Sequence, residues 1–292
     1  ATSSLFPPRQ ADAEPLNVVV TIPVLKDFAV HVGGPDVHVV SLLSGYENEH
    51  TYSPKPSDMV AVGQARVLLE VGLGLEGWVG TLVKSASNKR LMVVTTSKGI
   101  ALVREHESRD EPNRTTQSSR QLGNPHVWLD PENAKIMLRH ITEAFSAADP
   151  EHAGEYRKRQ ADYLVELDRL QSELLDRVRH LPDRRIIVHH PAWPYFARRF
   201  GFKIVGEILT QSGSEPSARH LQQLISKIRK EGIRVIVSEP QLNQKVPELL
   251  ARETGARVTV LTPLPGALKG TETYLDMLRY NVHQLARSLE AS

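Results

Sequence analysis

The residues best suited to chemistry in this sequence are its histidines. There are twelve of them and no cysteine, so a transition-metal site would have to use imidazole and carboxylate groups. His50, His126 and His190 each stand beside prolines, where a strand is expected to end or a helix to begin. Proline stiffens the backbone, which lowers the entropy that a ligand residue loses on binding an ion. Any one of them alone is explained as a turn histidine, whereas the three together indicate a metal site.

The elements that must carry these histidines alternate between strand and helix. Short β-branched runs predict strands at residues 17–22, 37–42, 67–71 and 91–96, with helices at 58–65 and 73–87. An Asp-Pro pair at residues 130–131 predicts a helix that runs to about residue 148. The alternation returns after residue 182, with strands at 185–190, 202–208, 234–239 and 257–261 and helices at 218–231, 246–254 and 271–291. Runs that are apolar on both faces suit parallel sheets covered by helices.

One long helix is expected between the two alternating regions. Residues 150–181 carry apolar side chains mostly three and four positions apart among many charges, a pattern that predicts one amphipathic helix of ~45 Å. It is interpreted as a rod between two lobes; the alternative, an antiparallel coiled-coil arm, finds no partner stripe of equal length. We therefore expect an N-terminal α/β lobe at 16–148, a linking helix at 149–181 and a C-terminal α/β lobe at 182–292. Ligands of such folds bind where the strands end, which places a site in the cleft between the lobes.

Composition excludes several classes of protein. The 36 basic and 34 acidic residues give a formal charge of +2, and no basic cluster is interleaved with aromatic residues, so nucleic acid is not an expected partner. No apolar run approaches the ~18–20 residues of a membrane-spanning helix. The polar segment 104–122 and the first fourteen residues are expected to be solvated loop and tail.

Five short motifs resemble those of a known family. They occur over residues 16–290, in the family's order, at 50–58 (HTYSPKPSD), 72–78 (GLGLEGW), 124–131 (NPHVWLDP), 190–196 (HPAWPYF) and 239–241 (EPQ). The chain in this way resembles the zinc and manganese solute-binding proteins of bacterial ABC importers, the ZnuA/TroA-like family. The resemblance implies two Rossmann-like α/β lobes joined by one long α-helix, with a metal ion between them.

The resemblance also implies which residues hold the ion. The family's ligands fall on His50, His126 and His190, while His189 should end the preceding strand and point the other way. The family's fourth ligand is an Asp, but Thr262 stands at that position, and a neutral hydroxyl is a poor zinc ligand. Glu239 is the nearest matching carboxylate.

Three roles stay open for Glu239: metal ligand, acceptor for the second ring N–H of a ligating histidine, or no role at the metal. Water is the competing fourth ligand. Glu47 and Glu49 lie close enough in sequence to reach the ion, but solvated loop charges are the favoured interpretation of both.

Three nitrogens and one oxygen favour Zn²⁺ over Mn²⁺, which prefers more oxygen ligands. The resemblance implies a monomeric periplasmic protein, its signal peptide removed, that delivers Zn²⁺ to the membrane permease of an ABC transporter. The absence of an N-terminal lipid-bearing cysteine agrees with a freely periplasmic protein, although a trimmed chain would look the same.

Two alternative functions are a zinc-dependent hydrolase or hydratase with an open fourth coordination position, and a metal-binding adhesin or chaperone on the same scaffold. No His-Glu-x-x-His or Gly-x-Ser-x-Gly motif supports an enzyme.

Overall fold

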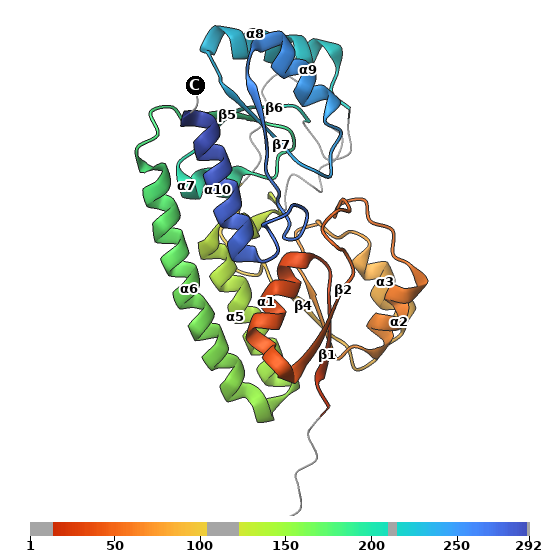
Figure 1. Cartoon of the computed structure of the whole chain (residues 1–292). Helices are drawn as coiled ribbons and strands as arrows, with labels where there is room; N and C mark the ends of the chain where they lie inside the picture. Colours follow the sequence, from red (N-terminus) through yellow and green to blue (C-terminus); the bar gives the residue numbers. More distant parts are fainter. Residues whose placement is uncertain (1–13, 104–122, 210–214, 291–292) are drawn as a thin grey trace, which may run out of the picture.

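The computed structural model describes residues 14–103, 123–209 and 215–290. The segment 104–122 and residues 1–13 of the tail, both expected to be solvated, lie outside the described residues. Figure 1 shows two lobes, one above the other, with a long helix running alongside.

Each lobe is built on a four-stranded parallel sheet. The strand orders, β2-β1-β3-β4 and β6-β5-β7-β8, are equivalent. Every predicted strand agrees with the structure to within two residues at each end. The strands are β1 (Leu16–Val20), β2 (Val37–Ser41), β3 (Val67–Glu70), β4 (Met92–Thr95), β5 (Arg185–Val188), β6 (Lys203–Glu207), β7 (Val235–Ser238) and β8 (Arg257–Val260).

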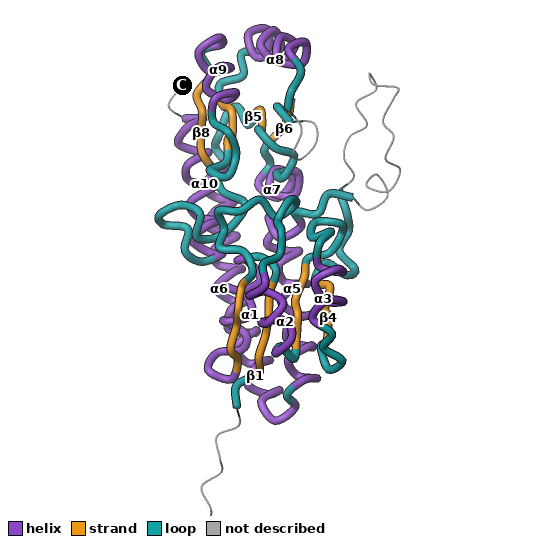
Figure 2. The backbone as a smooth tube through the Cα atoms, turned by 90° about the vertical axis from the view of Figure 1, so that its right-hand side faces the viewer, coloured by secondary structure: helices purple, strands orange, loops and turns teal. Residues whose placement is uncertain are grey.

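Helices cover the two sheets, and the loops gather between the lobes (Figure 2). The helices around the first sheet are α1 (Pro23–Gly33), α2 (Pro56–Gln64), α3 (Val79–Ala86) and α5 (Pro131–Ala148). Those of the second lobe are α7 (Pro194–Phe200), α8 (Ala218–Glu231), α9 (Lys245–Thr254) and α10 (Tyr274–Glu290). The sequence pattern did not predict α1 or α7 individually.

The helix expected from residue 73 begins only at Val79, so that prediction was wrong at its start. Gly72, Leu73 and Gly74 have φ angles of +84°, +58° and +79°, which are left-handed and cannot continue into an α-helix. A tight turn therefore separates β3 from α3.

The predicted linking helix is present as α6 (Ala153–Arg179), 27 residues long, after a 3₁₀ turn at Pro150–His152. At 1.5 Å per residue it spans ~40 Å. It packs against α1 and α5 of the first lobe and against the C-terminal helix α10. Among the described residues, no helix is both long and apolar enough to cross a membrane. The exact division at 16–148, 149–181 and 182–292 stays a prediction.

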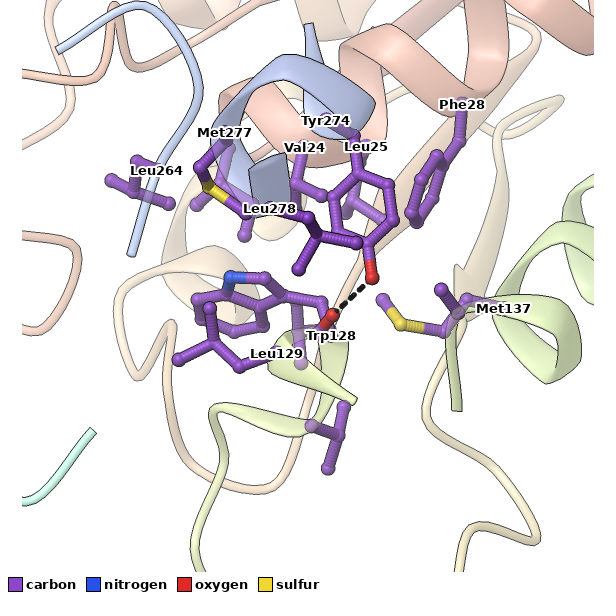
Figure 3. Close-up of a cluster of buried hydrophobic side chains, with 14 of the residues drawn as sticks. Val24, Leu25, Phe28, Trp128, Leu129, Met137, Leu264, Tyr274, Met277 and Leu278 are labelled. Atoms are coloured by element: carbon purple, nitrogen blue, oxygen red, sulfur yellow. Dashed lines mark hydrogen bonds between the residues drawn. The ribbon is translucent and has the colours of Figure 1, made fainter. Parts of the chain in front are cut away.

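An apolar cluster joins the two lobes at their waist (Figure 3). Trp128 and Tyr274 lie at its centre, both fully buried. The Trp128 indole donates to the Pro263 carbonyl at 2.7 Å, and the Tyr274 hydroxyl donates to the Trp128 carbonyl at 2.6 Å. The Tyr274 ring also packs edge-on against Phe28 of α1, with centroids 4.8 Å apart. Because well-packed interiors do not deform continuously, this waist resists large movements of one lobe against the other.

Candidate metal centre

Three loops at the carboxyl ends of the strands bring His50, His126 and His190 together. His50 lies in the loop between β2 and α2, His126 directly before the 3₁₀ turn Val127–Leu129 that leads into α5, and His190 just after β5. One ring nitrogen from each lies within 4.8 Å of the others. The Nε2 atoms of His50 and His126 are 3.3 Å apart, and the ring centroids are 4.9–5.5 Å apart. Among the described residues, these three histidines form the group whose ligand atoms lie close enough together to bind one ion.

Burial keeps two of these imidazoles neutral. Desolvation, with the neighbouring histidines, lowers the pKa of His50 to about 3 and that of His126 well below its usual value. Burial also acts to lower the pKa of His190, but the charge and hydrogen bond of Glu239, together with the charges of Glu49 and Glu207, outweigh it, so the pKa of His190 is raised. A neutral imidazole has a free lone pair, which is the form that binds a metal.

Glu49 is buried beside the three rings. Only 4% of its surface is exposed, and its Oε1 lies 3.5 Å from Nε2 of His126. Neither Glu49 Oε1 nor His190 Nε2 has a hydrogen-bond partner within the described part of the chain. A buried polar atom without a partner carries a desolvation cost, which a cation bound among these atoms would relieve. The interpretation of Glu49 as a solvated loop charge was wrong.

The inward position of Glu49 depends on the motif at residues 72–78. The Trp78 indole donates to the Glu49 carbonyl at 3.2 Å. In the same motif the buried Glu76 accepts from the Thr21 hydroxyl at 2.7 Å and from the backbone amides of Val71 and Gly72 at 2.8 and 2.9 Å, which ties the motif to the ends of β1 and β3. The loop that carries Glu49 and His50 is thereby tied to the end of the first sheet.

Glu239 lies on the far side of His190. Its Oε2 is 3.3 Å from His190 Nδ1, and its Oε1 accepts from the Trp193 indole at 2.9 Å. Asn124 plays a similar part for His126, with its Oδ1 3.1 Å from Nδ1 of that ring. Such acceptors fix the ring so that Nε2 faces the metal. Of the three roles left open for Glu239, this geometry fits the acceptor.

Two other residues considered from the sequence lie outside the three-histidine group. The Thr262 side chain is fully buried; its hydroxyl donates to the Leu264 carbonyl at 2.7 Å and accepts from the Leu264 amide at 3.2 Å. Nδ1 of His189 lies 3.2 Å from the Ser238 hydroxyl. Thr262 therefore braces its own turn, and His189 pairs with the neighbouring strand end.

Comparison with known proteins agrees with this architecture. The model of the family described as "ZnuA: Zinc-uptake complex component A periplasmic" matches residues 18–288. The chain belongs to this family. A high-affinity zinc uptake system protein ZnuA from Brucella abortus is 29% identical over 281 residues, covering 85% of this chain and 83% of that protein.

Solved structures share the fold. A crystal structure of ZnuA superposes with a TM-score of 0.83 at 29% identity, covering 94% of this chain and all of that chain. A manganese-bound mutant of a periplasmic metal-binding protein from Candidatus Liberibacter asiaticus reaches 0.79 at 25% identity, covering 93% of this chain and 98% of that one. The ZnuA family consists of solute-binding components of zinc uptake and not of enzymes. The hydrolase and adhesin alternatives are therefore not favoured.

Proposed function

We propose that this chain captures one Zn²⁺ ion through Nε2 of His50, His126 and His190 and a carboxylate oxygen of Glu49. The observation that carries the proposal is the convergence of three imidazole nitrogens beside a buried carboxylate oxygen that has no hydrogen-bond partner among the residues the structure describes. Zinc–nitrogen bonds of ~2.0–2.1 Å in a tetrahedron put neighbouring ligand atoms about 3.3 Å apart. The spacing of 3.3 Å between the nitrogens of His50 and His126 fits that geometry.

The donor set favours zinc over manganese. Three imidazoles suit Zn²⁺, whereas Mn²⁺ prefers several carboxylate, carbonyl or water oxygens. Glu239 acts in this proposal as the acceptor that orients His190, and not as a ligand, because both of its oxygens face other donors. Cu²⁺ would bind the same nitrogens strongly, so selection against it depends partly on supply.

Delivery completes the proposed function. The protein acts as a periplasmic monomer that hands Zn²⁺ to the membrane permease of an ABC importer. The family description, a periplasmic component of a zinc-uptake complex, supports this partner and compartment. The ion would be cargo, bound by the chain and then released.

The test measures metal directly. Protein purified without added metal is analysed by mass spectrometry for bound ions, and its melting temperature is recorded with Zn²⁺, with Mn²⁺ and with a chelator. We expect one zinc per chain and a rise in melting temperature on adding zinc, because a ligand that binds only the folded state stabilises it. A larger shift with manganese than with zinc would contradict the choice of ion, and no shift with either would contradict the function.

A further inference from the structure

The loop that carries Glu49 and His50 is held from both lobes. On its own side, the Trp78 indole binds the Glu49 carbonyl. On the other side, Nε2 of Gln241 donates to the Gly45 carbonyl at 3.1 Å. Gln241 follows β7 of the second sheet, so this hydrogen bond crosses from one lobe to the other.

The two lobes touch closely at this point. Gly45 has a φ of +107°, and a Cβ atom there would lie 2.7 Å from the Pro265 carbonyl oxygen, a distance that real Cβ atoms do not adopt. Pro265 follows β8 of the second sheet. Glycine is therefore required by both the backbone conformation and the contact with the second lobe.

The Gln241 side chain takes no part in holding its own turn. Within the described residues, the hydrogen bond that the Gln241 side chain makes is the one from Nε2 to the Gly45 carbonyl. Its Oε1 is buried without a hydrogen-bond partner there. The turn is instead braced by Gln244, whose Nε2 donates to the Glu239 carbonyl at 2.6 Å and to the Leu242 carbonyl at 2.8 Å. The two side-chain amides of this turn therefore have different roles. Gln244 closes the turn, and Gln241 forms a hydrogen bond across the lobe boundary.

This turn contacts the metal centre from two directions. Glu239 faces the ring of His190, while Gln241, two residues on, holds the loop that carries His50. A short braced turn of the second lobe therefore fixes the separation between two of the three histidines. His50 is also the least buried of the three.

We propose that Gln241 is a positioning residue for metal retention: its hydrogen bond to Gly45 holds the His50 loop against the second lobe and slows release of the ion. Gln241 does not touch the ion; it acts through the loop. This inference rests on the proposed function, because it presupposes a metal held by His50.

The test compares Gln241→Met with Gln244→Met. Methionine keeps an unbranched side chain of similar length without the N–H donor, so packing is largely preserved. Zn²⁺ release from the full-length protein is timed in a stopped-flow instrument with an excess of a chromophoric chelator, and the melting temperature of each metal-free protein is recorded. We expect Gln241→Met to release zinc about two- to tenfold faster, the range that one neutral hydrogen bond supplies. The change in melting temperature should be small, because the substitution leaves the Gly45 carbonyl without its donor but also removes the buried Gln241 Oε1, which lacks a partner among the described residues. Gln244→Met loosens the turn that carries both Glu239 and Gln241, so it should lower the melting temperature, which distinguishes it from Gln241→Met.

Gly45→Ala provides a second route to the same contact, because its methyl group would push the loop away from Pro265. It should also accelerate release. Wild-type release rates in Gln241→Met would overturn the inference while leaving zinc capture intact. Failure of the wild-type protein to bind zinc would instead overturn the proposed function itself.

Discussion

Replacing Glu49 by glutamine separates the proposed fourth ligand from its alternatives. The substitution keeps the size and shape of the side chain and removes one negative charge. The Glu49 side chain is buried, and its Oε1 finds no hydrogen-bond partner in the described ranges of the chain. Glu49→Gln should therefore leave the metal-free protein as stable as the wild type or make it more stable, while weakening its hold on zinc.

The expected loss of affinity follows from the charge left uncompensated. Removing one partner of a buried charged pair costs about 3–5 kcal/mol, which corresponds to a decrease of roughly 140- to 4,000-fold in zinc affinity. Glu239→Gln alters only the acceptor behind His190, and changes to such supporting residues cost about 10- to 100-fold. Glu49→Gln should therefore be the weaker binder of the two.

The assay is competition for Zn²⁺ against a chromophoric chelator at pH 7.5, with the melting temperature of the metal-free proteins measured in parallel. Glu49→Asp is the matched control, because it keeps the charge on a side chain one methylene shorter. The reasoning is refuted by a Glu49→Gln affinity within threefold of wild type. It is also refuted by a larger loss in Glu239→Gln, which would make Glu239 the ligand.

Three further outcomes are expected. His126→Ala removes one of three ligand nitrogens and should abolish tight zinc binding; wild-type affinity in equilibrium dialysis would reject the site. Trp128→Phe leaves the buried Pro263 carbonyl without its donor and should lower the free energy of unfolding by about 1–3 kcal/mol, measured by urea denaturation. Burial raises the pKa of Glu76 to about 7 from 4.5, so between these pH values the carboxyl takes up a proton on folding. The contribution of the protonated Glu76 to the free energy of unfolding is therefore lost as the pH rises from 4.5 through 7. Between pH 4.5 and 7.5 the free energy of unfolding of metal-free Glu76→Gln should therefore rise by up to about 3 kcal/mol relative to that of the wild type. A difference in unfolding free energy between the two proteins that does not change with pH would contradict this.

The waist between the lobes bears on how the ion would leave. Trp128 lies two residues beyond His126, with the ring centroids 5.3 Å apart, and it is hydrogen-bonded to Pro263 and Tyr274 from the second half of the chain. A lobe movement large enough to separate His126 from His190 would have to break this buried contact. Movement of the His50 loop would break the hydrogen bond of Gln241 and the close contact at Gly45, which lie at the lobe boundary.

Much of the fold could be predicted from the sequence because it depends on local patterns. Apolar runs located the strands, and the spacing of apolar side chains located α6. The start of α3 was missed because the apolar spacing was extended back through the left-handed turn at residues 72–74; Gly72 and Gly74 suit that conformation, whereas Leu73 gives no local signal for it. The histidines were singled out by their proline-rich surroundings, and the structure brings the same three together.

The partners of those histidines could not be read from the sequence. Glu239 and Glu49 are both acidic residues close to a motif, yet one faces the back of His190 and the other lies beside Nε2 of His126. That difference depends on contacts between residues far apart in the chain, such as Trp78 with the Glu49 carbonyl. In a loop without a regular repeat, sequence spacing does not determine where a side chain points. The sequence thus determined which residue types are available, and tertiary packing decided which of them face a shared point, because only packing sets directions between distant loops.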